Sequence, residues 1–92
     1  MKIQNYRNLE RSVKGFSNHR RIQMLELIKK EPELSVFEIA EKLRMEIKNV
    51  SAHLQKMAIA GLVLKRSDGV NIRHKATNLG EDVLHFLYSL GR

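Results

Sequence analysis

Apolar residues recur every three or four positions through most of this chain, a spacing typical of helices that bury one side. The first predicted helix spans about residues 3–15. A second follows a good capping residue, and both Ser17 and Asn18 qualify. This helix is expected to end in the segment KKEPE, because helical geometry is disfavoured in the residue before Pro32.

Two further helices are predicted to follow, joined by a tight connection. The segment SVFE marks the first start, since the Ser35 side chain can accept from the backbone N–H of Glu38 while the Glu38 carboxylate accepts from the serine N–H. This short helix is expected to end near Arg44. The next helix spans about residues 47–60, and Gly61 follows where a left-handed C-terminal cap is expected.

Beyond this glycine, apolar and basic residues alternate, which is typical of strands. The segments LVLKR and VNIRHKA flank SDGV, whose Asp-Gly pair favours a two-residue turn, so we predict a hairpin over residues 63–76. Thr77 can cap a last helix over about residues 78–90. This helix has too many apolar residues for one buried side, so we expect part of it to meet another chain. They are Leu79, Val83, Leu84, Phe86, Leu87, Tyr88 and Leu90.

These elements predict a mainly α fold with a small β-hairpin wing, the winged helix-turn-helix. A chain of 92 residues is expected to form a single domain. Within it we expect an N-terminal dimerisation helix (residues 1–16), a winged-helix core (17–76) and a C-terminal helix (77–92).

The helix predicted over residues 47–60 separates apolar from polar positions. Its predicted buried stripe consists of Ile47, Val50, Leu54 and Met57. Its remaining sides contain no acidic residue and suit a helix lying in the major groove, where side chains must approach bases without repelling phosphates. We therefore interpret one set of residues as a DNA-binding surface, the reading face: Lys48, Asn49, Ser51, Ala52, His53, Gln55 and Lys56.

Charge is unevenly distributed along the chain, whose formal net charge is +7. Residues 1–21 and 44–76 each carry +5, whereas residues 22–43 carry −2 and residues 77–92 carry −1. Basic blocks separated by acidic stretches favour a surface that binds a polyanion such as nucleic acid. A surface that only keeps the protein in solution would more often mix the two signs.

Several classes of function are excluded by the sequence. It contains no cysteine, so it has neither a disulfide nor a thiolate for metal binding or catalysis. The N-terminal segment does not resemble a signal peptide, and no apolar run approaches the ~20 residues of a membrane helix, so we expect a cytoplasmic protein. Without a phosphate-binding glycine loop, a carboxylate pair or a nucleophile motif, an enzyme is not expected.

Three segments carry a family resemblance: HRRIQMLELIKKEPELSVFEIAEKL, VSAHLQKMAIAGLV and KRSDG, in that order. Over about residues 17–82 the chain resembles the ArsR-type winged-helix regulators, and the TNLGE start of its last helix is more similar to the MarR type. The resemblance implies a homodimeric transcriptional regulator that binds double-stranded DNA, expected to be a repressor. It also implies that Ser51 and His53 face the DNA. Two residues depart from the family pattern: Glu46 replaces a serine, and Arg44 stands where glycine is frequent. The arginine is tolerable there if it ends its helix without a left-handed conformation, and its presence weakens the motif.

The predicted wing offers a second set of contacts, to the DNA backbone or the minor groove: Lys65, Arg66, Arg73 and Lys75. Basic residues also protect a sheet edge from aggregation, and the two roles are compatible. His53 can contact DNA or cap the edge of the core, and Ser51 can contact DNA or bond back to its own helix. Arg20 and Arg21 can bind phosphates or be ordinary solvated residues.

By the same resemblance, the outer helices form the dimer, through Tyr6, Leu9, Val13, Val83, Phe86, Leu87 and Leu90. Metal sensing is the best-known activity of the ArsR type, but SVFE stands where thiolate ligands would lie. Asp82 and His85 share one side of the last helix and lack the further ligands of a full site. His19 and His74 have no evident partners either, so we expect no metal and no cofactor.

A second hypothesis belongs to another class of protein, a winged-helix module for protein–protein contact within a larger assembly. It requires an apolar patch on the helix of residues 47–60, where Ile47 and Ile59 are the candidates. The basic bias of residues 44–76 favours DNA instead.

Overall fold

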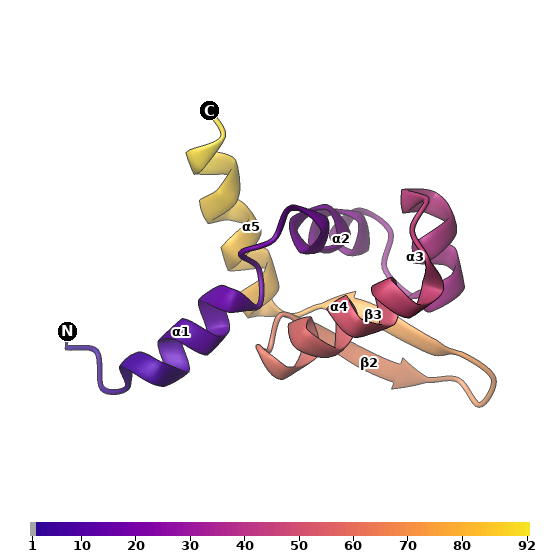
Figure 1. Cartoon of the computed structure of the whole chain (residues 1–92), viewed down its shortest axis with the longest axis horizontal. Helices are drawn as coiled ribbons and strands as arrows, with labels where there is room; N and C mark the ends of the chain where they lie inside the picture. The colour runs from indigo at the N-terminus through magenta and orange to yellow at the C-terminus, as the bar shows by residue number, and fades with distance from the viewer. Residues whose placement is uncertain (1) are drawn as a thin grey trace.

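The computed structural model of the chain describes residues 2–92, which form five α-helices and three short strands (Figure 1). The helices are α1 (Tyr6–Lys14), α2 (His19–Lys30), α3 (Val36–Leu43), α4 (Ile47–Ile59) and α5 (Asn78–Leu90). The strands β1 (Leu34–Ser35), β2 (Val63–Ser67) and β3 (Ile72–Ala76) form one antiparallel sheet in the order β1-β3-β2. The predicted fold, mainly α with a hairpin wing, is confirmed.

Polar side chains start the helices largely where the sequence predicts. The capping box is formed, with the Ser35 N–H donating to the Glu38 carboxylate at 2.9 Å and the Glu38 N–H donating to the Ser35 hydroxyl at 3.2 Å. Asn18 is the cap of α2, and its side chain accepts from two backbone N–H groups. Thr77 caps α5. The first helix begins later than predicted, because Asn5 caps it by accepting a backbone hydrogen bond.

The connection between α3 and α4 depends on the conformation of Arg44. Arg44 adopts the left-handed conformation, with φ 54° and ψ 51°, so the condition under which an arginine is readily tolerated here is not met. The change of chain direction between α3 and α4 requires this conformation. It allows the Arg44 N–H to donate to the Glu41 carbonyl at 3.3 Å and the Met45 N–H to donate to the Ala40 carbonyl at 2.9 Å. A side chain in this region costs about 1 kcal/mol relative to glycine. At the end of α4, Gly61 takes the predicted left-handed conformation, with φ 78°.

The predicted hairpin is present, but its turn is longer than two residues. Residues 68–71 separate the strands. The Asp68 carboxylate accepts from the backbone N–H groups of Val70 and Asn71, at 3.0 and 2.7 Å, and the Asp68 N–H donates to the Asn71 carbonyl. Gly69, with φ 94°, supplies the positive φ of the turn. It is the second of the four residues between the strands, whereas in a two-residue Asp-Gly turn the glycine would be the last residue before the second strand.

The core lies between α2, α3, α4 and the sheet. Its least exposed apolar side chains are Met24, Leu25, Ile28, Ile39, Val50, Leu54, Met57 and Leu62. Ala40 and Val50 are both buried where α3 packs on α4, and a small residue allows this close crossing. The two helices therefore form the helix-turn-helix pair, with the β2–β3 hairpin beside α4 (Figure 1).

The two outer helices are weakly buried. The described part of α1 contains no buried residue, and Figure 1 shows α1 and α5 extending away from the central helices. In α5 only Gly80 and Leu84 are buried, and Gly80 sits so close to the chain that an added Cβ would lie 2.3 Å from the Leu62 carbonyl oxygen. No helix within residues 2–92 combines the length and apolar character needed to cross a membrane.

Candidate nucleic-acid interface

The two sides of α4 differ in exposure as its sequence predicts. Val50, Leu54 and Met57 are buried, with at most 1% of each residue exposed. On the outer side, six reading-face residues are exposed: Lys48, Asn49, Ser51, Ala52, Gln55 and Lys56. The seventh, His53, is half-buried. Because α4 contains no acid, this uncovered surface is polar and basic.

The prediction that Ile47 belongs to the buried stripe is wrong, since 44% of this residue is exposed. It is the first residue of α4 and lines an open hollow together with Phe37 and Ala40 of α3, so its side chain is only partly covered. The preceding Glu46 is the N-cap, and its side chain makes no capping hydrogen bond. The departure from a serine at this position therefore leaves the start of α4 without the usual side-chain acceptor.

His53 is held by an arginine from α2. The Arg21 Nη1 lies 3.0 Å from His53 Nδ1, and Arg21 Nη2 donates to the Lys14 carbonyl at 3.0 Å. Burial, followed by the nearby Arg21 charge, lowers the pKa of His53 below its usual range. A neutral imidazole that accepts at Nδ1 carries its hydrogen on Nε2, which leaves that nitrogen as the donor. Only 8% of Arg21 is exposed, so its interpretation as an ordinary solvated residue is wrong.

The wing divides its basic residues between two faces. The strand register pairs Lys65 with the buried His74, whereas Arg66 pairs with Arg73 on the opposite face. Lys75 shares that second face. A hollow of about 440 Å³ between α4 and the hairpin is lined by Ser51 and Lys65 among others, so these two predicted contacts come together.

The two arginines of the wing are occupied by acids. Arg66 Nη2 lies 2.7 Å from the Glu33 carboxylate, and this hydrogen bond lowers the pKa of Glu33. Arg73 Nε lies 2.8 Å from the Asp68 carboxylate. Two backbone N–H groups and this arginine hold the pKa of Asp68 far below its usual range. The arginines thus stabilise the wing's shape, and their charges are partly neutralised before any partner binds.

The two lysines of the wing differ from its arginines. Lys65 and Lys75 are exposed, and no ion pair within residues 2–92 involves either one. A phosphate would therefore meet these ammonium groups without having to displace an acid.

His74 is a structural residue that the sequence interpretation left without partners. Only 1% of it is exposed, and its Nδ1 lies 2.9 Å from the Leu34 carbonyl oxygen, joining β3 to β1. Burial lowers the pKa of His74, which favours the neutral imidazole. The alternation of inward and outward residues along the strand was the available signal, since His74 occupies an inward position.

The predicted dimer residues lie on α1 and α5 with large exposed areas. Tyr6 is 70% exposed, and Phe86 and Leu90 are 56% and 65% exposed. Leu9 and Val13 are also exposed, while Val83 and Leu87 are half-buried. Asp82 and His85 are exposed on α5, and within residues 2–92 no group of three or more His, Cys, Asp or Glu residues is arranged to hold a metal.

The fold and these surfaces define a winged helix-turn-helix protein of the ArsR type, as the sequence resemblance implied. The chain belongs to the HVO_A0114 family, whose model matches residues 16–83. No curated protein matches the chain.

Solved structures support the class. Mb0332 from Mycobacterium bovis, described as a homodimeric winged helix-turn-helix DNA-binding domain and a possible ArsR-family transcriptional regulator, is 26% identical with a TM-score of 0.82 over 99% of this chain and 90% of that chain. NolR from Sinorhizobium fredii is 22% identical, with a TM-score of 0.82 over 98% of this chain and 96% of that chain. The transcriptional repressor PagR of Bacillus anthracis is 24% identical, with a TM-score of 0.75 over 90% of this chain and 99% of that chain. The description of Mb0332 as a possible transcriptional regulator agrees with the expectation that this chain is not an enzyme.

Proposed function

We propose that the chain is a sequence-specific regulator of transcription that binds double-stranded DNA as a homodimer and acts as a repressor in the cytoplasm. In this proposal α4 lies in the major groove, and the β2–β3 hairpin contacts the backbone or the minor groove. The main observation behind it is the exposed side of α4, whose central residues are mainly polar or basic and include no acid. The fold shared with Mb0332, described as a DNA-binding domain, supports it.

The proposed dimer forms through α1 and α5. Most of their predicted interface residues are exposed in the single chain, and exposed aromatic side chains such as Tyr6 and Phe86 favour burial against a partner. A two-fold dimer would present two α4 helices about 34 Å apart, one helical turn of DNA, and would therefore bind a roughly palindromic site.

The alternative is a winged-helix module that binds another protein. The observation that favours it is the exposure of two isoleucines on α4, 44% for Ile47 and 66% for Ile59. They stand at the two ends of the helix, with the basic reading face between them. Because the apolar surface is interrupted in this way, DNA remains the better partner.

A binding experiment on duplex DNA separates these functions. The protein is first titrated into a random duplex at low salt, and the sequences it prefers are then selected from a random pool. We expect binding that weakens steeply with salt, because lysines and arginines displace counterions. No detectable binding at low salt would refute the proposal and favour the protein partner.

Three variants test the division of roles between helix and wing. We expect Lys48→Ala and Gln55→Ala to change the preferred sequence, because these side chains would reach base edges. We expect Lys65→Ala to weaken binding to all sequences alike, as loss of a phosphate contact does. Lys30→Ala, an exposed lysine on α2, is the control for the change in charge. An equal loss on every sequence in all three variants would contradict these roles.

A further inference from the structure

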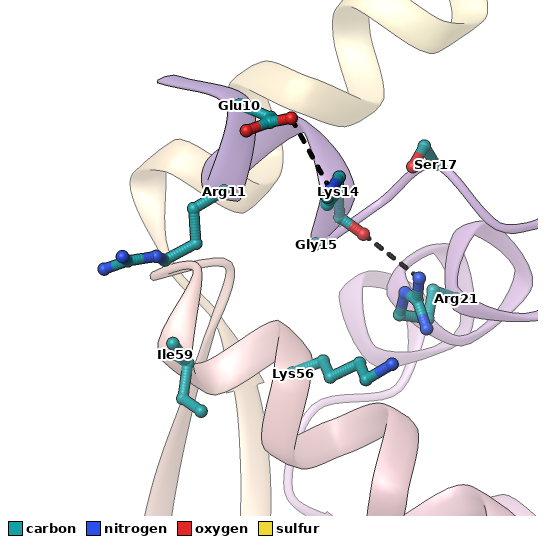
Figure 2. Close-up of a pocket in the computed structure, with 8 residues that line it drawn as sticks. All are labelled: Glu10, Arg11, Lys14, Gly15, Ser17, Arg21, Lys56 and Ile59. Carbon is teal, nitrogen blue, oxygen red and sulfur yellow. Dashed lines mark hydrogen bonds and ion pairs between the residues drawn. The ribbon is translucent and has the colours of Figure 1, made fainter. Parts of the chain in front are cut away.

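A basic hollow of about 390 Å³ lies between the end of α1 and the C-terminal half of α4 (Figure 2). Four cations and one carboxylate are among its lining residues: Arg11, Lys14, Arg21, Lys56 and Glu10. The carboxylate of Glu10 is paired with Lys14 at 3.5 Å. In Figure 2 the Lys56 side chain extends from α4 toward the side of the hollow where Arg21 lies.

The end of α1 and the end of α4, which border this hollow, are in close contact. An added Cβ on Gly15 would lie 2.3 Å from the Ala60 Cβ, so only a glycine lets the end of α1 approach α4 this closely. Arg21 links the same elements, because it donates to the Lys14 carbonyl and contacts His53 on α4. The cationic lining is therefore built into the fold.

Arg21 is a buried cation without a counter-charge. It is only 8% exposed, and both hydrogen-bond partners of its guanidinium are neutral: the His53 imidazole and the Lys14 carbonyl. No ion pair within residues 2–92 includes it, and its Nε has no hydrogen-bond partner. A buried charge is normally compensated by an opposite charge, since removal from water is costly.

We propose that the hollow is an oxyanion site that binds a phosphate group through Arg21 and Lys56. Each Nη group of Arg21 donates one hydrogen bond within the protein and has a second N–H that a phosphate oxygen can accept from. Lys56 supplies further positive charge. The phosphate comes from the DNA backbone or from a free phosphate compound. Lys56 belongs to the reading face, so a duplex along α4 would bring a backbone phosphate to this end of the helix; this source rests on the proposed function.

The first arm of the test titrates inorganic phosphate into the full chain, by calorimetry at constant ionic strength in chloride. We expect saturable binding that weakens about tenfold in Lys56→Gln, the loss of one charge-assisted hydrogen bond. Lys30→Gln removes the same charge from an exposed position outside the hollow and should bind as the wild type does. Arg21→Lys keeps the charge without the fork and should also bind more weakly, provided that its thermal unfolding matches the wild type.

The second arm measures duplex binding as a function of salt for the same variants. If the site takes a backbone phosphate, the slope of log K against log salt decreases by about 0.9 in Lys56→Gln and not in Lys30→Gln. If the salt slope of duplex binding is unchanged in Lys56→Gln while inorganic phosphate binds more weakly to this variant, the site is assigned to a free phosphate compound. Phosphate binding without any duplex binding supports the site and refutes the proposed function. If Lys56→Gln matches Lys30→Gln in both arms, the oxyanion site is refuted.

Discussion

Replacement of Phe86 by serine is the sharpest test of the proposed dimer. A phenylalanine side chain has about 200 Å² of surface, of which the 56% exposed fraction is about 110 Å². Burial of this area against a partner is worth about 3 kcal/mol at about 25 cal/mol per Å². A two-fold interface contains the residue twice, so Phe86→Ser should weaken the dimer by about 6 kcal/mol, or about four powers of ten in Kd.

Sedimentation velocity over a dilution series measures this change directly. Phe37→Ser is the matched control, because Phe37 is 64% exposed but lies on α3, away from the proposed interface. We expect the control to dimerise like the wild type and Phe86→Ser to sediment as a folded monomer, since Phe86 is not needed by the core of the single chain. A Phe86→Ser protein that dimerises as tightly as the control would refute the assignment of this surface.

Three further predictions concern stability. Arg44→Gly should raise the free energy of unfolding by about 0.5–1 kcal/mol, because glycine adopts the left-handed conformation without strain, and a decrease in urea melts would contradict this. Glu46→Ser should add a capping acceptor worth about 1 kcal/mol and, by removing an acid beside the reading face, tighten duplex binding in anisotropy titrations. The pKa values of His53 and His74 are lowered from 6.5 in the folded chain, so the unfolded chain binds more protons as the pH falls. The free energy of unfolding should therefore be highest above about pH 6.5 and decrease below it. Urea melts that are unchanged between about pH 7.5 and pH 5 would refute this.

Short-range features of the fold were predictable because their partners are close in the sequence. The capping box joins Ser35 to Glu38, three residues away, and the structure forms it as predicted. The left-handed Gly61 follows from the end of an apolar pattern in the same way. Such features depend on local geometry, which a spacing along the chain specifies.

The conformation of Arg44 could not be decided from the sequence, because a tertiary requirement overrides a local preference. Arginine by itself disfavours a positive φ, but the packing of α3 on α4 needs a reversal at this point. The burial of Ile47 was mispredicted for a related reason. A helical wheel gives the side of α4 on which Ile47 lies, but not how far the rest of the chain covers the first residue of the helix.

The residues of single helices and of the hairpin were enough to predict the order of the five helices and the hairpin, the buried positions Val50, Leu54 and Met57 of α4, and the absence of acids from its outer side. The strand β1 was not predicted, because its two residues become a strand only by pairing with β3. Which charges are available to a partner depends on contacts between distant parts of the chain. Arg21 and His53 are 32 residues apart and Arg66 and Glu33 are 33 apart, and no spacing indicates that either pair meets. Side-chain partners at such separations are chosen by how the helices pack, which depends on the whole core at once.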